Sequence, residues 1–187
     1  MLKKLCLAAA LALPLSAMAE GLSYSYVEAG YVMADIDGGG EADGFGFGGS
    51  YLFAPQIYAT ASYSRLKTDT SPKIEISGFS GGVGFRQPLN ATVDANLEVG
   101  FIAADVDAGS FGSDDDTGYS VGAGLRAMVA KQLELNGGVS YAKVFDEGET
   151  SFDVGGVFSF TPQFAAIAGA SFADDANTYS FGGRFMF

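Results

Sequence analysis

The chain has 187 residues, and its composition and charge narrow the classes of protein to which it can belong. A net charge of −12 argues against nucleic acid as a partner, because nucleic-acid-binding surfaces are basic. The single cysteine, Cys6, excludes a disulfide framework within the chain. Yet 48% of the residues are apolar, and Gly, Phe and Tyr are abundant. Acidic and aromatic side chains therefore have to occupy different zones of the molecule.

The first 19 residues have the features of a secretory signal peptide. Lys3 and Lys4 precede a short apolar run, and Ala19 ends a small-x-small cleavage site before Glu20. The run is too short to cross a bilayer as a helix, and no later stretch approaches the roughly 20 apolar residues that a helix needs. We expect cleavage between Ala19 and Glu20, which leaves residues 20–187 as a single exported domain.

Ten stretches in which every second residue is apolar follow the signal peptide. In chain order they span residues 23–34, 44–54, 57–66, 76–86, 93–103, 117–129, 133–145, 150–160, 164–173 and 178–187. Alternation with period 2 is typical of a β-strand that has one apolar and one polar face. Each stretch has about 10 to 13 residues, which suits a strand tilted across the hydrocarbon layer of a membrane.

The last stretch, 178–187, shows what the two faces carry. Tyr179, Phe181 and Phe185 share one face, whereas Ser180 and Arg184 lie on the other. The aromatic face has no reason to contact water, and the small polar face has no reason to line a dry core. One such strand also fits a half-buried position in a soluble sheet, but ten of them favour a membrane barrel, apolar outside and polar inside.

The connections between the stretches alternate between two kinds. Turns at 54–56, 87–91, 130–132 and 161–163 alternate with acidic stretches at 35–43, 67–75, 105–116, 146–149 and 174–177, which hold 16 of the 22 acidic residues. A charge facing lipid at mid-membrane costs a few kcal/mol, which explains why the apolar faces carry almost none. Because every backbone group has to be paired in lipid, the sheet has to close.

We therefore predict an all-β fold, a ten-stranded antiparallel up-and-down transmembrane barrel. Short periplasmic turns and longer acidic extracellular loops join its strands. The even number of strands places both ends of the barrel on the periplasmic side.

With these features the chain resembles small outer-membrane barrels of the OmpX and OmpA-transmembrane type. The resemblance lies in the signal peptide, the alternating strands, the turn pattern and the terminal Phe187. The opening Ser23–Tyr31, followed by Asp-Gly loops, resembles a ten-strand, xanthomonad-type outer-membrane family. The resemblance implies the outer membrane of a Gram-negative bacterium, contact with lipid and lipopolysaccharide, and recognition of Phe185 and Phe187 by the barrel-assembly machinery. It implies no catalytic motif.

The predicted inward faces carry three basic and five acidic residues. They are Glu28, Arg86, Asp94, Glu98, Arg126, Glu134, Asp153 and Arg184. Glu28, Arg126 and Arg184 lie at a similar depth and Glu98 slightly deeper, so we expect a layer of ion pairs that bridges the first, fifth, sixth and tenth strands. Such pairs either close the lumen or line a narrow polar path. The many inward glycines leave space for the second interpretation.

The acidic stretches contain weak candidates for a calcium site. They are Asp105, Asp107, Asp114, Asp115 and Asp116, since calcium takes several oxygen ligands at close range. None of these stretches completes an EF-hand pattern. A solvated anionic surface is the simpler interpretation, and divalent cations that bridge it to lipopolysaccharide phosphates need no defined site.

No catalytic or cofactor site is predicted. The chain has no His, and no nucleophile is paired with a base. The glycine-rich stretch 44–49 lacks the Lys and the following helix of a phosphate-binding loop. The expected function is that of a non-enzymatic outer-membrane barrel in envelope integrity, adhesion or surface interaction through acidic loops. The alternatives are a narrow porin-like channel for small solutes and, in another class, a secreted soluble sandwich with a binding role.

Overall fold

The computed structural model describes residues 22–38, 40–71 and 73–187, so the predicted cleavage site at Ala19 and Glu20 lies outside the described residues. The strands are β1 (Tyr26–Ile36), β2 (Gly40–Ala54), β3 (Ile57–Thr68), β4 (Glu75–Pro88), β5 (Val93–Asp107), β6 (Ser113–Ala130), β7 (Leu133–Val144), β8 (Glu147–Ser159), β9 (Phe164–Ala173) and β10 (Ala176–Met186). A short 3-10 helix, η1 (Gly109–Phe111), lies between β5 and β6. In the described ranges no helix has the length and apolar character needed to cross a membrane.

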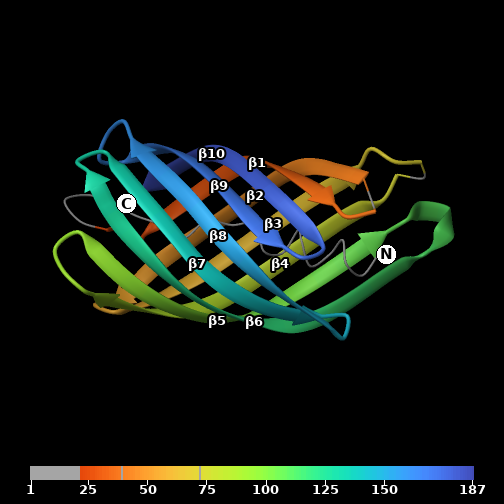
Figure 1. The fold of residues 1–187 in the computed structure, drawn as a ribbon, viewed down its shortest axis with the longest axis horizontal. Helices are drawn as coiled ribbons and strands as arrows, with labels where there is room; N and C mark the ends of the chain where they lie inside the picture. Colours follow the sequence, from red (N-terminus) through yellow and green to blue (C-terminus); the bar gives the residue numbers. More distant parts are fainter. Residues whose placement is uncertain (1–21, 39, 72) are drawn as a thin grey trace.

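The ten strands form one closed antiparallel barrel, as Figure 1 shows. Each strand pairs with its neighbours in the sequence, and β10 pairs with β1 from Tyr26↔Met186 to Ile36↔Ala176. The predicted ten-stranded up-and-down barrel is therefore confirmed. The end of β10 lies with the turns at the end of the barrel that we call periplasmic, opposite the acidic extracellular end.

Strand pairing extends further into the acidic stretches than the sequence predicts. β6 begins at Ser113 and β8 at Glu147, whereas the alternation suggested starts at 117 and 150. As a result, the acidic connections 145–146 and 174–175 are as short as the turns 55–56 and 131–132. The physical reason is that exposed carboxylates on a strand end do not prevent the backbone from pairing, so the ladders continue beyond the apolar faces.

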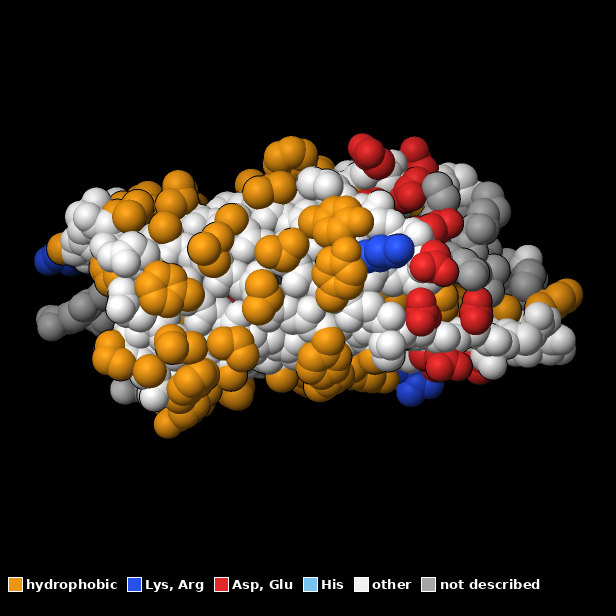
Figure 2. Space-filling model, turned by 90° about the horizontal axis from the view of Figure 1, so that it is seen from below, with side chains coloured by type: hydrophobic (Ala, Val, Ile, Leu, Met, Phe, Trp, Pro, Cys, Tyr) orange, Lys and Arg blue, Asp and Glu red, His pale blue; other side chains and the backbone are white. Residues whose placement is uncertain are grey.

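The outer face of the barrel separates apolar from acidic side chains. In Figure 2 hydrophobic side chains are distributed along most of the length of the barrel, and Asp and Glu gather toward the extracellular end. Large apolar residues such as Phe45, Leu97 and Phe101 point outward and are more than half exposed in the isolated chain. Such a surface is stable only against lipid, so the barrel spans the membrane.

Candidate functional site

The lumen of the barrel is the candidate functional site, and it consists of three layers. We call them the periplasmic layer, the polar cavity and the apolar layer, in order from the periplasmic to the extracellular end.

The periplasmic layer contains three ion pairs. They are Arg86 Nη2–Asp94 Oδ2 at 3.0 Å, Arg126 Nε–Glu134 Oε1 at 2.9 Å, and Arg184 Nε–Glu28 Oε2 at 2.8 Å. Each pair joins two adjacent strands, because inward side chains on neighbouring strands lie within reach of one another. Each guanidinium therefore has a carboxylate partner of its own.

Residues 22–25 fill the space between these ion pairs, and we call this segment the N-terminal latch. The Tyr24 ring is 2% exposed and lies 4.0 Å from Cζ of Arg126 and 4.7 Å from Cζ of Arg86. Its ring centroid is 4.7 Å from that of Tyr58. Arg126 Nη2 also donates a hydrogen bond to the Ser23 carbonyl oxygen at 3.1 Å. Aromatic rings stacked on guanidinium planes fill this end of the lumen.

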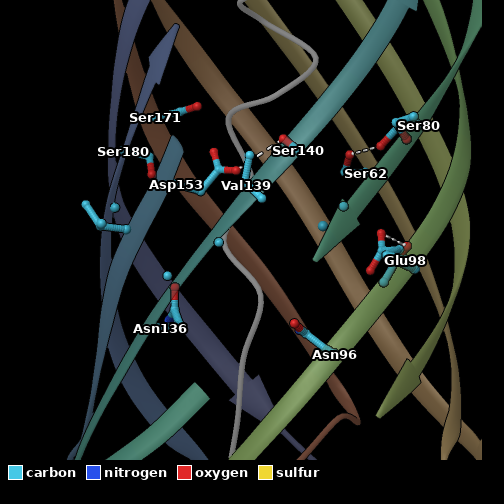
Figure 3. A pocket seen from close by; sticks show the side chains of 18 of the residues that line it. Ser62, Ser80, Asn96, Glu98, Asn136, Val139, Ser140, Asp153, Ser171 and Ser180 are labelled. Atoms are coloured by element: carbon cyan, nitrogen blue, oxygen red, sulfur yellow. Dashed lines mark hydrogen bonds between the residues drawn. The ribbon is translucent and has the colours of Figure 1, made fainter. Parts of the chain in front are cut away.

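The polar cavity lies next to the periplasmic layer and has a volume of about 160 Å³. Figure 3 shows the side chains that line it. Its hydroxyl groups include those of Ser62, Ser80, Ser120, Ser140, Ser171 and Ser180. Thr60 Oγ1 donates a hydrogen bond to Glu98 Oε1 at 2.9 Å, and Ser140 Oγ donates one to Asp153 Oδ2 at 3.2 Å. Hydroxyl, amide and carboxyl oxygens thus share the cavity wall with glycines and apolar residues, and of its three carboxyl groups Glu28 is already paired with Arg184.

The apolar layer lies at the extracellular end of the lumen. Its main side chains are at most 2% exposed and come from five strands: Val32, Leu66, Ile76, Ile102, Val106 and Val144. Sequence analysis missed this layer, although the signal is present. Along β5 the inward positions run from Glu98 through Gly100 to Ile102 and Val106, so the inward face changes from polar to apolar toward the extracellular end.

The predicted inward charges divide into two groups. Six of them form the periplasmic layer, in which Arg126 pairs with Glu134 on β7. Glu98 on β5 and Asp153 on β8 lie in the polar cavity instead, and within the described part of the chain neither forms an ion pair with Arg or Lys. The reason is register: Arg126 lies opposite Asp94 on β5, and Glu98 is two inward positions further along.

The five candidate calcium ligands do not come together. Asp105 and Asp115 lie directly opposite each other, but Asp116 accepts a hydrogen bond from the Phe145 backbone nitrogen at 2.6 Å. Asp107 accepts one from the Gly109 nitrogen at 2.7 Å. Alternation places Asp114 and Asp116 on the other face from Asp105, Asp107 and Asp115. Among the residues that the structure describes, no group of three or more His, Cys, Asp or Glu can hold a metal ion.

Comparisons with known proteins agree with this architecture. The family model of the outer membrane protein beta-barrel domain matches residues 5–185. The NanC porin has a TM-score of 0.57 at 8% identity, with 87% of this chain and 100% of that chain covered. The outer membrane protein OprG from Pseudomonas aeruginosa has a TM-score of 0.50 at 11% identity, with 91% and 99% covered. No curated protein sequence matches the chain.

These similarities establish the fold and the family. At such low sequence identity, they do not indicate which ligand, if any, this chain binds. The family match spans almost all of the chain, and the apolar outer face agrees with a place in the membrane. The chain belongs to the outer membrane protein beta-barrel family and is an integral protein of the Gram-negative outer membrane.

Proposed function

We propose that this barrel is a non-enzymatic protein with a closed lumen that acts through its acidic extracellular end, in envelope integrity, adhesion or surface interaction. The observation that carries the proposal is the apolar layer. Its side chains are almost completely buried, and apolar constrictions exclude water and ions from a lumen. The ion pairs and the N-terminal latch block the opposite end. The absence of His from the whole chain supports a non-enzymatic role.

The acidic end supports a role at the surface of the membrane. Asp105, Asp107 and Asp115 are exposed, and alternation puts them on the outer face, next to the lipid headgroups. The headgroups of lipopolysaccharide are anionic as well. Divalent cations between the two anionic surfaces would therefore tie the rim of the barrel to the outer leaflet. At the opposite rim, Phe185 and Phe187 remain our proposed recognition signal for the barrel-assembly machinery.

Single-channel recording in planar bilayers tests whether the lumen is closed. We expect no stepwise conductance from the purified native barrel. Stepwise conductance of the native protein would contradict a closed lumen and would support the second candidate function, a narrow channel for small solutes. The observation that favours this second candidate is the polar cavity, which gives part of the lumen the character of a pore.

A permeability assay in cells tests the role of the acidic rim. Deletion of the gene is expected to increase uptake of a hydrophobic dye, and the native protein should reverse the increase. A variant with Asp105→Asn, Asp107→Asn and Asp115→Asn should reverse it less, at equal abundance in the outer membrane. Asp174→Asn, at the tip of a different hairpin, is the matched control. Unchanged dye uptake in the deletion strain would contradict a role in envelope integrity.

A further inference from the structure

The polar cavity contains an excess of negative groups that the protein itself does not balance. Arg86, Arg126 and Arg184 each have their own carboxylate in the periplasmic layer. In the described part of the chain, the hydroxyl group of Thr60 donates a hydrogen bond to Glu98 and that of Ser140 donates one to Asp153. Removing a charged carboxylate from water without a counter-charge is strongly unfavourable. The cavity therefore provides a strong electrostatic reason for a cation.

A second and independent feature of the cavity is the side chain of Asn96. It is 4% exposed and lines the cavity, where Figure 3 shows it near the Glu98 side of the lumen. Neither its amide nitrogen nor its amide oxygen has a hydrogen-bond partner in the described part of the chain. A buried polar group without a partner destabilises the folded chain. The amide is thus positioned to bind something that occupies the cavity.

Glycines on the neighbouring strands make room for this arrangement. Gly124 lies opposite Asn96, and a Cβ built there would be only 2.7 Å from Asn96 Oδ1. The same relation holds for Gly155 and Asn136, whose oxygen would be 2.6 Å from such a Cβ. A side chain at either glycine would compete with the amide for space. Because Gly124 and Gly155 have no side chain, the amides of Asn96 and Asn136 can lie against the cavity wall.

We propose that the polar cavity binds one small inorganic cation, alkali or alkaline-earth, together with part of its hydration shell. Carboxylate, amide and hydroxyl oxygens are the ligands that such hard cations prefer. A cavity of about 160 Å³ has room for a cation and a few waters at roughly 30 Å³ each. Water completes the coordination, since only two carboxylates, Glu98 and Asp153, take part. An alkaline-earth cation would balance both carboxylates and an alkali cation half of their charge, and either would provide a partner for the Asn96 amide.

Rubidium locates the cation directly, because it scatters anomalously. The native barrel is refolded and crystallised in RbCl as the only small-cation salt. The expected result is an anomalous peak inside the lumen, within contact distance of Glu98 or Asp153 oxygens. A complete absence of anomalous density in the lumen, with peaks only at the acidic rim, would overturn the proposal. This measurement needs no variant and does not depend on whether the barrel conducts.

Stability measurements test the same site in solution. We compare the thermal unfolding midpoint of barrels refolded at equal ionic strength in NaCl, in CaCl₂ and in N-methylglucamine chloride, whose cation is too large for the cavity. The native midpoint should be lower with N-methylglucamine by at least about 3 °C. Glu98→Gln with Asp153→Asn should abolish this difference, and Glu98→Gln alone should reduce it.

Asp115→Asn, which removes an exposed carboxylate at the extracellular rim, is the matched control. It should keep the full dependence on the small cation, because its side chain is outside the lumen. If Asp115→Asn removes the dependence and the cavity variants keep it, the cation acts at the rim and the proposal is wrong. A native midpoint that is the same in all three salts would also overturn it.

Discussion

At the scale of single residues, the space left by one glycine determines how the periplasmic end of the lumen closes. Tyr58 is 1% exposed and lies opposite Gly84 in the β3–β4 register. A Cβ built at Gly84 would overlap the Tyr58 ring. The ring therefore covers the glycine backbone, and from there it contacts the ring of Tyr24 in the N-terminal latch.

Gly84→Ala should displace the Tyr58 ring and lower the free energy of unfolding by about 1–3 kcal/mol, the usual cost of overpacking. The measurement is urea unfolding of the barrel in lipid vesicles, followed by cold gel migration. Gly156→Ala is the control, because a Cβ there would meet its nearest atom, Leu135 Cδ2, at an ordinary 3.6 Å. Equal losses of stability in both variants would show that the Tyr58 contact is not responsible.

The turn between β7 and β8 contains strained backbone. Phe145 has φ of 54° and Asp146 has φ of 61°, values that favour glycine. A left-handed conformation costs an L-residue roughly 1–2 kcal/mol, less for Asp, so Asp146→Gly should raise the free energy of unfolding by up to about 1 kcal/mol. The exposed ion pair between Asp146 Oδ1 and Lys143 Nζ, at 3.5 Å, contributes little to the free energy of unfolding.

Urea unfolding of the same kind measures this gain. Asp174→Gly, in the turn between β9 and β10, is the control, because Asp174 is not among the described residues with positive φ. The free energy of unfolding should not rise in Asp174→Gly, because at this position glycine only makes the unfolded chain more flexible. A gain at Asp174 as large as the gain at Asp146 would mean that removal of charge, and not backbone strain, explains the effect.

At the scale of elements, the pair Glu28–Arg184 holds the seam at which β1 meets β10. The two residues lie directly opposite each other, and their side chains are 4% and 0% exposed. Breaking a buried pair by removing one partner is expensive, so Arg184→Met should cost about 3–5 kcal/mol. The double variant Glu28→Leu with Arg184→Met should recover most of this loss, because no buried charge is left unpaired.

Folding yield and urea unfolding of both variants measure this effect. If the double variant is as unstable as Arg184→Met, the loss comes from packing around the guanidinium, including the Tyr26 ring 4.0 Å from its Cζ atom, and not from the charge.

The N-terminal latch is the second element with a separable role. Tyr24→Ala removes the ring that lies between Arg86 and Arg126, and it should open the polar cavity to the periplasm. A cysteine introduced as Ser62→Cys reports on this opening, because Ser62 lines the cavity. A membrane-impermeant thiol reagent should label it many times faster in Tyr24→Ala than in the background with Tyr24.

Reagent added from the extracellular side is the control, and it should label both proteins slowly. Fast labelling of Ser62→Cys with Tyr24 still present would contradict the idea that the latch closes this end of the lumen.

At the scale of the whole molecule, the proposed closed lumen rests on two barriers in series that differ in their chemistry. The latch and the ion pairs pack at the periplasmic end, and the apolar layer packs at the extracellular end. Two barriers in series predict that opening one of them produces no conduction. Tyr24→Ala alone should show no stepwise conductance in single-channel recording. The variant with Ile76→Gly and Ile102→Gly should show none either.

The variant that combines all three substitutions should show stepwise conductance, provided that heat-modifiable gel migration shows a folded barrel. Conductance of Tyr24→Ala alone would contradict the role of the apolar layer as an independent barrier.

The state of the lumen is the feature that the sequence pattern leaves undecided. The pattern of inward charges left two interpretations open, a closed lumen and a narrow path. The predicted lumen residues are all polar or charged, whereas Val32, Ile102 and Val106 are apolar inward positions toward the extracellular ends of their strands. Those positions belong to the same alternation, so a longer reading of each strand would have predicted the apolar layer.

The sequence by itself determined the number of strands, their outward faces, the apolar band and the acidic extracellular end. These features follow from alternation and charge along the chain, which are local properties of each strand. Only the tertiary structure decided that Arg126 pairs with Glu134, that Tyr24 packs against Arg86 and Arg126, and that Glu98 and Asp153 share a cavity. Partners across a lumen depend on strand register and on closure of the barrel, and both are set by contacts between residues far apart in the chain.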